Sequence, residues 1–194
     1  MASSFRKDLE FGNRIELAWM NFMGDKTLKT YEQSKGKEPG WDIVELNDKV
    51  YFEVKWDTKS SAAWSSYGTR RDPTGNLFIE YVNPSADKDS GIRASISKYW
   101  VYVVKYAPNS LVDENSFGDY KAHAHLFNRE ALLKFCESSN LNTRDTKRDV
   151  GKGMPVNARG WILPWDIVNE SKKDSGWLAV YDISDYLSLP ILTQ

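Results

Sequence analysis

Two acidic side chains and a lysine stand at a spacing that would bring them together on one β-hairpin. Asp42 and Glu53 lie on either side of Asn47-Asp48, and Lys55 follows Glu53 by two residues. Asn and Asp tolerate the positive φ that a two-residue type I′ turn requires, so we expect Asn47 and Asp48 to form the loop. The residue numbers of each cross-strand pair then add up to 95, and Asp42 faces Glu53.

This pairing predicts a metal site. Directly opposed residues on one face have Cβ atoms about 4.5–5.5 Å apart, and two like charges so placed repel each other. A divalent cation bound by Asp42 and Glu53 would neutralise that repulsion. Side chains alternate along a strand, so Lys55 shares the face of Glu53 and stands beside the two acids. Carboxylate-bound Mg²⁺ suits phosphodiester hydrolysis, whereas a salt bridge on a solvated hairpin is the structural alternative.

The same residues carry a family resemblance. Asp42, ten intervening residues and Glu53-Val54-Lys55, preceded by an amphipathic segment with Glu16, resemble the PD-(D/E)XK nuclease superfamily of restriction enzymes, junction resolvases and phage exonucleases. Gly40-Trp41 stands where the motif has its proline. The resemblance covers roughly residues 5–105 and implies an α/β fold in one domain over residues 1–194. Its restriction-endonuclease-like core would be a central mixed sheet of four to five strands flanked by α-helices.

The resemblance also implies roles for the site residues. Asp42 and Glu53 would bind Mg²⁺, for which Mn²⁺ would substitute, and the backbone carbonyl of Val54 would be a further ligand. Lys55 would position the attacking water, and Glu16 would join the site through water. Burial lowers the pKa of a lysine and neighbouring acids raise it, so the sequence leaves the charge of Lys55 open.

Basic residues suggest where nucleic acid would bind. The segment 57–75 interleaves cations, hydroxyls and aromatic rings, which is the composition that phosphate contacts and base stacking use. Arg93 and Lys98 stand just before an apolar strand. A later basic run within residues 144–159 is either a second nucleic-acid surface or a solvated loop. The candidate contacts are Lys59, Arg70, Arg71, Arg93 and Lys98.

The remaining pattern predicts the elements that hold these residues in place. Apolar spacing predicts a helix over residues 5–23 that ends at Gly24-Asp25. Asn128 is placed to cap a later helix. The other expected elements are strands at 76–82 and 99–104, a helix at 129–138, a loop at 140–159, and a strand leading to a short helix at 160–168.

Composition limits the classes of function. The net charge of −1 confines any DNA surface to part of the molecule, and the single cysteine excludes an internal disulfide. No apolar run approaches the roughly 18 residues of a membrane span, so we expect no membrane partner and a cytoplasmic protein, in the host cytoplasm if viral. The expected function is that of a metal-dependent deoxyribonuclease, and a homodimer is one possible assembly. The alternative is a catalytically inactive nucleic-acid-binding or interaction module on the same fold.

Overall fold

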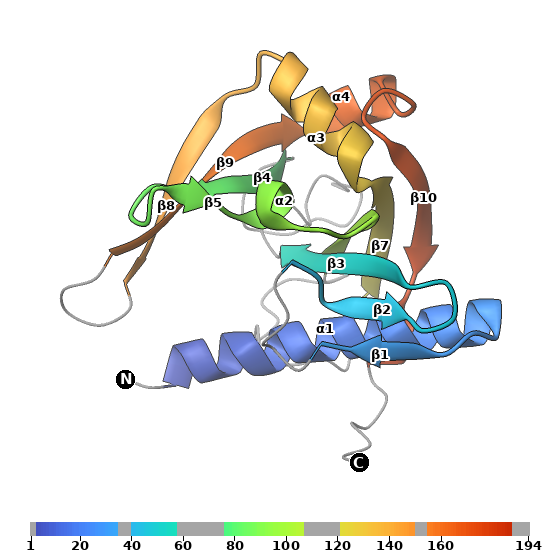
Figure 1. The fold of residues 1–194 in the computed structure, drawn as a ribbon. Coiled ribbons are helices and arrows are strands. Elements are labelled where there is room, and N and C mark those ends of the chain that lie inside the picture. Colours follow the sequence, from blue (N-terminus) through green and yellow to red (C-terminus); the bar gives the residue numbers. More distant parts are fainter. Residues whose placement is uncertain (1–2, 35–39, 58–75, 107–120, 150–154, 188–194) are drawn as a thin grey trace.

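The computed structural model describes residues 3–34, 40–57, 76–106, 121–149 and 155–187, and the protein is an α/β structure (Figure 1). Its helices are α1 (Ser3–Thr27), α2 (Gly91–Ala94), α3 (Arg129–Ser138), α4 (Trp165–Glu170) and α5 (Ser184–Leu187). Its strands are β1 (Tyr31–Gln33), β2 (Ile43–Glu45), β3 (Val50–Asp57), β4 (Asn76–Asn83), β5 (Lys88–Asp89), β6 (Tyr99–Tyr106), β7 (Lys121–Asn128), β8 (Thr143–Asp149), β9 (Pro155–Pro164) and β10 (Trp177–Asp182).

Within the described ranges the strands form two sheets. The larger has six strands in the order β1-β2-β3-β6-β7-β10. It is mixed because β3 and β6 run parallel while its other neighbours are antiparallel. The smaller sheet is antiparallel, in the order β5-β4-β9-β8. The predicted mixed sheet is therefore present, but it is wider than the expected four to five strands, and the strand expected at 76–82 lies in the second sheet.

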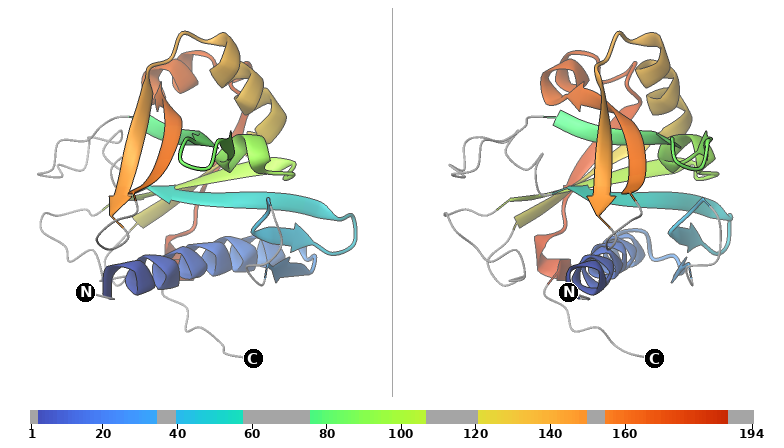
Figure 2. Two further views of the ribbon diagram at one scale, coloured as in Figure 1. Left: turned by 60° about the vertical axis from the view of Figure 1, so that its left-hand side comes forward. Right: turned by 90° about the vertical axis from the view of Figure 1, so that its left-hand side faces the viewer.

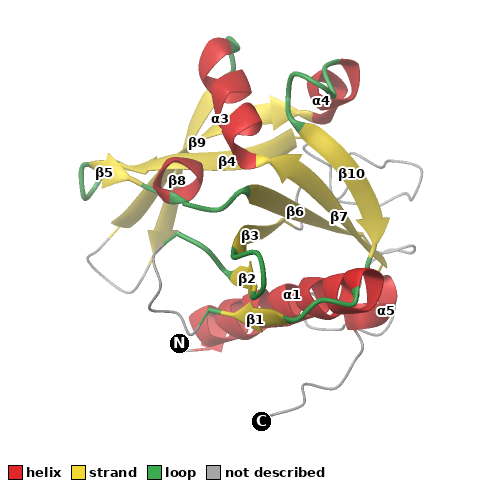
Figure 3. Cartoon of the chain, turned by 45° about the vertical axis from the view of Figure 1, so that its right-hand side comes forward, coloured by secondary structure: helices red, strands yellow, loops and turns green. Residues whose placement is uncertain are grey.

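Strand β6 divides the core into two parts. Val101 and Val103 pack in a cluster with α1 and α5 on one face of the six-stranded sheet. Trp100, Tyr102 and Val104 point the other way, into a cluster with the second sheet, α3 and α4. This alternation follows from the two-residue period of a strand that is buried on both faces. Strand β3 consequently lies between α1 and the second sheet (Figures 2 and 3).

Helix α1 is longer than its pattern predicts. The expected end at Gly24-Asp25 is wrong, because the helix continues to Thr27. Leu28 then adopts a φ of 57° and donates its N–H to the carbonyl of Gly24 at 2.8 Å. A helical glycine costs only about 1 kcal/mol, and packing of the helix on the sheet outweighs that cost.

The second half of the chain contains two correct predictions and one incorrect prediction. Asn128 caps α3 as expected, with its side-chain oxygen accepting the N–H of Ala131 at 2.9 Å. The predicted strand leading to a short helix at 160–168 is also present, as the end of β9 and α4. The loop predicted for 140–159 is wrong, because β8 and β9 pair as a long hairpin. Its composition is polar, which concealed the strands from a search for apolar alternation.

Candidate functional site

The hairpin that carries the site has the predicted register but a different turn. Ile43 pairs with Phe52 and Glu45 with Val50, so the cross-strand residue numbers add up to 95 as expected. The type I′ turn at Asn47-Asp48 is wrong, because the ladder ends at Glu45 and Val50 and the loop spans residues 46–49. The positive φ, 53°, falls on Lys49.

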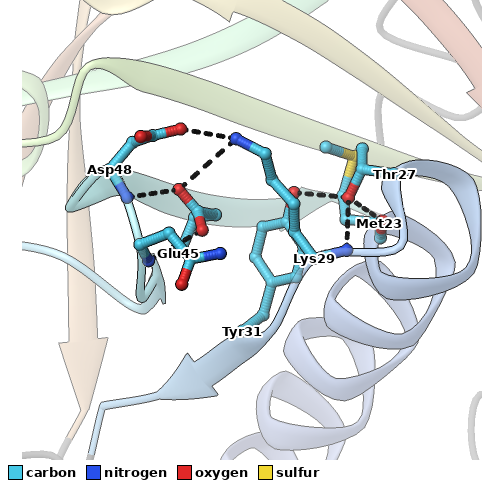
Figure 4. A network of polar contacts seen from close by, with 7 residues as sticks. Met23, Thr27, Lys29, Tyr31, Glu45 and Asp48 are labelled. Atoms are coloured by element: carbon cyan, nitrogen blue, oxygen red, sulfur yellow. Dashed lines mark hydrogen bonds and ion pairs between the residues drawn. The ribbon is translucent and has the colours of Figure 1, made fainter.

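A buried carboxylate explains the turn. The side chain of Glu45, only 2% exposed, accepts the backbone N–H groups of Asn47 and Asp48, each at 2.8 Å. The Lys29 ammonium binds Asp48 at 2.5 Å and lies 3.7 Å from Glu45 (Figure 4). Glu45 thus accepts two N–H groups of the four-residue loop, which would otherwise lack hydrogen-bond partners. Lys29 compensates the buried charge.

Asp42 and Glu53 meet at the other end of this hairpin. The register of paired residues ends at Ile43 and Phe52, and the backbone N–H of Asp42 donates to the Phe52 carbonyl at 2.9 Å, one residue out of that register. Oδ2 of Asp42 accepts the N–H of Val54 at 2.7 Å. Burial raises the pKa of Asp42 to about 6, and the charge of Glu53 adds to the rise against the opposing effects of Lys55 and the Val54 amide. The two acids are therefore close enough to repel.

Lys55 lies beside both acids, and these neighbours determine its charge, which the sequence left open. Its Nζ is 2.5 Å from Oε1 of Glu53, whose residue is 7% exposed. Burial alone would lower the pKa of the ammonium, but the negative charges of Glu53 and Asp42 outweigh it and hold the pKa above its usual value. Lys55 is a cation here and not a neutral base.

Helix α1 brings Glu16 to the same place. Nε2 of Gln33, on β1, donates to Oε2 of Glu16 at 2.6 Å. Burial raises the pKa of Glu16 to about 7, and the charge of Asp42 adds to the rise, while Gln33 and Lys55 lower it. The structure thus gathers Glu16, Asp42, Glu53 and Lys55, which are far apart in sequence, into one electrostatically coupled group.

Two serines that the sequence did not single out, Ser95 and Ser97, fix the backbone at Gly40, two residues before Asp42. Oγ of Ser95 lies 2.8 Å from the Gly40 carbonyl and 3.4 Å from Oε2 of Glu53. Ser97 Oγ and the Ile96 N–H also donate to the Gly40 carbonyl, at 3.1 and 3.0 Å. Gly40 has a φ of 88°, and a Cβ there would lie 2.9 Å from a backbone oxygen. Serines in a short linker carry no signal of such a long-range role.

The predicted nucleic-acid contacts fall in different places. Lys59, Arg70 and Arg71 lie outside the described residues. Lys98 is exposed, with Nζ 5.3 Å from the ring centroid of Tyr99.

Arg93 has structural partners on the second sheet and on α3. Its guanidinium binds Glu137 at 3.0 Å and stacks over Tyr81 and Trp161, 4.7 and 5.2 Å from their ring centroids. In the later basic run, Arg159 pairs with Asp145 at 2.6 Å.

Two histidines, His123 and His125, stand two residues apart on β7. His125 is fully buried, its ring 4.4 Å from that of Trp165, and burial lowers its pKa to about 3. Nowhere in the described ranges do three His, Cys, Asp or Glu side chains form a ready-made metal cluster. A metal at the hairpin would thus rely on Asp42 and Glu53 with backbone and water ligands, a donor set that suits Mg²⁺.

No protein-family model, curated protein or solved structure matches this chain. Among the helices of the described residues, none has the length and apolar character needed to cross a membrane.

The raised pKa values predict how stability depends on pH. Between pH 4 and pH 7 the folded state holds protons on Glu16 and Asp42 that the unfolded chain releases, so stability should fall as the pH rises through this window. Glu16→Gln should flatten the profile and raise the free energy of unfolding at pH 8 by roughly 1–3 kcal/mol. Denaturant unfolding in EDTA from pH 4 to pH 8 measures this. The control is Glu32→Gln, because Glu32 is exposed on β1. If the free energy of unfolding of Glu16→Gln depended on pH as that of the wild type does, the prediction would be contradicted.

Proposed function

We propose that the protein is a Mg²⁺-dependent deoxyribonuclease of the PD-(D/E)XK type. The observation that carries the proposal is the convergence of Asp42, Glu53 and Lys55 on one hairpin face, with Glu16 joining them from α1. All three acids are partly or fully buried, and among the described residues Lys55 is the cation that they share. An excess of buried negative charge is costly for a structural site, but it is what a site for a divalent cation requires.

The donor set fits magnesium. Asp42 and Glu53 would bind the ion, the Val54 carbonyl would add a ligand, and Mn²⁺ would substitute. Mg²⁺ commonly takes one or two protein carboxylates and keeps several waters, so two acids are enough. Bound there, the ion would supply an activated water and neutralise charge on the phosphate.

The chain's own residues would do the rest. Lys55, kept protonated by its acidic neighbours, would donate hydrogen bonds to the water or to a phosphate oxygen and offset negative charge as the phosphodiester is attacked. Glu16, with a pKa of about 7, can accept or release a proton near neutral pH and would do so through water. Gln33 orients the Glu16 carboxylate for that exchange.

The arrangement of elements supports the same proposal. We infer a restriction-endonuclease-like core made of α1, the antiparallel strands β1, β2 and β3, and the parallel strand β6. The substrate would be DNA, held by exposed cations such as Lys98. A homodimer would place two such sites on a duplex, as cleavage of both strands requires.

Metal binding can be tested without any assay of cleavage. Mg²⁺ should raise the melting temperature of the wild type by about 3–6 °C at ten times its dissociation constant, because it binds only the folded state. Asp42→Asn should abolish this shift, and Glu130→Gln, which removes an exposed carboxylate paired with Lys134 on α3, should retain it. Equal shifts in the wild type and Asp42→Asn would place the metal elsewhere.

The alternative is a binding module that kept the fold without the chemistry. It predicts retention of DNA by the wild type with no strand cleavage in any divalent metal. The coupled acids and protonated lysine favour the enzyme, since binding the phosphate backbone uses cations and gains nothing from buried carboxylates.

A further inference from the structure

The linker between α2 and β6, residues 95–98, crosses beside the end of the hairpin that carries the two proposed metal ligands. The backbone N–H of Ile96 donates to the Gly40 carbonyl, and that of Lys98 donates to the Tyr51 carbonyl, each at 3.0 Å. Gly40 and Tyr51 each precede one of the proposed metal ligands by two residues. The linker therefore contacts the chain close to both acids.

Arg129, the first residue of α3, also binds this linker. Its Nε donates to the Ser97 carbonyl at 2.8 Å, and its backbone N–H donates to the Lys98 carbonyl at 3.1 Å. A second guanidinium nitrogen donates to the carbonyl of Ile92, in α2, at 3.1 Å. Both the hairpin and α3 thus hold the linker in place. A fixed backbone is the condition under which its side chains can position another group.

Two buried serines of the linker contact the hairpin, and their contacts differ in one respect. Ser95 is 5% exposed and Ser97 is 1% exposed. Both hydroxyls donate to the Gly40 carbonyl, at 2.8 Å from Ser95 and 3.1 Å from Ser97. Of the two, Ser95 also lies against a proposed metal ligand, with its Oγ 3.4 Å from Oε2 of Glu53. Ser95 therefore touches both the backbone that leads to one acid and the carboxylate of the other.

The hydrogen bonds around Gly40 leave the proton of the Ser95 hydroxyl available to Glu53. The Ser97 N–H donates to Oγ of Ser95 at 3.2 Å, so the hydroxyl proton is what Ser95 offers to other groups. A carbonyl oxygen has two lone pairs, and the Ile96 N–H with the Ser97 hydroxyl can occupy both of those on Gly40. The 3.4 Å contact is longer than an ordinary hydroxyl hydrogen bond, and a small shift of either side chain shortens it.

We propose that Ser95 is a positioning residue of the metal site, which donates its hydroxyl proton to Oε2 of Glu53 and ties that carboxylate to the chain leading to Asp42. Carboxylates that bind metal ions are themselves hydrogen-bonded, and loss of such a partner commonly costs about 10–100-fold in metal affinity. Lys55 contacts Oε1, so Ser95 and Lys55 hold the two oxygens of Glu53 separately. The effect on metal affinity rests on the proposed function, whereas the contact itself does not.

Metal titration tests the positioning role without an assay of cleavage. Isothermal titration calorimetry with Mg²⁺ and with Mn²⁺ would compare the wild type, Ser95→Ala and Ser97→Ala in the absence of DNA. Ser95→Ala should weaken metal binding about tenfold or more, and Ser95→Thr, which keeps a hydroxyl, should recover part of the loss. Ser97→Ala is the matched control, because it removes a neighbouring buried serine bound to the same carbonyl, and it should bind within about threefold of the wild type. Equal dissociation constants for the wild type and Ser95→Ala, or equal weakening by the two alanine variants, would overturn the proposal.

A double-mutant cycle on stability tests the contact in the absence of metal. Denaturant unfolding in EDTA would compare the wild type, Ser95→Ala, Glu53→Ala and the double variant. Residues in contact give non-additive effects, so the unfolding equilibrium constants should depart from additivity by at least about threefold. The same cycle with Ser97→Ala should be additive within about twofold.

The outcomes of the two experiments separate the contact from the proposed function. An additive cycle for Ser95→Ala and Glu53→Ala would overturn the contact and the proposal with it. A non-additive cycle in a protein that binds neither metal would instead support the contact and reject the metal site on which the proposed nuclease function depends.

Discussion

Lys55→Ala is expected to lower the rate of Mg²⁺-dependent DNA cleavage by about 10²–10⁴-fold. The variant removes the cation that, among the described residues, the site's carboxylates share, so no other described side chain replaces its hydrogen bonds to the water or the phosphate. Because the carboxylates remain, metal binding should persist and tighten. Single-turnover cleavage of end-labelled DNA measures the rate, and a titration of labelled DNA in Ca²⁺ measures binding.

The matched control is Lys134→Ala. Lys134 also pairs with a glutamate, Glu130, at 2.8 Å, but on the exposed surface of α3. Its removal should change the cleavage rate less than twofold. If Lys55→Ala cleaved DNA within a few-fold of the wild-type rate, Lys55 would be a structural partner of Glu53 only.

Gly91→Ala is expected to destabilise the fold by about 2–5 kcal/mol. An L-residue at a φ of 50° costs roughly 1–2 kcal/mol, and forcing a methyl group into packed backbone costs about 1–3 kcal/mol more. The methyl would overlap the carbonyl of Glu80, which can yield only if β4 moves. Urea unfolding monitored by tryptophan fluorescence gives the change in free energy.

Gly12→Ala provides the comparison for this glycine. Gly12 lies within α1, and a Cβ there has nothing within 4 Å. The same substitution should stabilise the protein by about 0.5–1 kcal/mol, since alanine is the better helix former. Equal effects of the two substitutions would show that the close approach of Gly91 to Glu80 is absent in solution.

The sequence predicted the local part of the site and missed the long-range part. The register of Ile43–Glu45 with Val50–Phe52, which brings Asp42 and Glu53 near each other, could be predicted because a strand has a fixed two-residue period. The turn itself could not, because it depends on the Glu45 carboxylate and on Lys29.

The second sheet was the larger omission. Residues 143–159 are polar, so periodicity gave no sign of strands there, and the pairing of β9 with β4 joins segments about eighty residues apart. Ser95 likewise reaches Glu53 only through a contact between residues far apart in sequence. Helix α3 was easier, because its Asn128 cap and apolar spacing are both encoded locally.

The most direct test of the account is cleavage by the wild type and Asp42→Asn in parallel, each with Mg²⁺, with Mn²⁺ and with EDTA. The substrates would be end-labelled single-stranded, duplex and branched DNA, with RNA of the same sequence. We predict that the wild type cuts at least one DNA substrate with either metal, and that EDTA or Asp42→Asn abolishes cutting. DNA that stays bound and intact under every condition, or equal cutting by both proteins, would contradict the account.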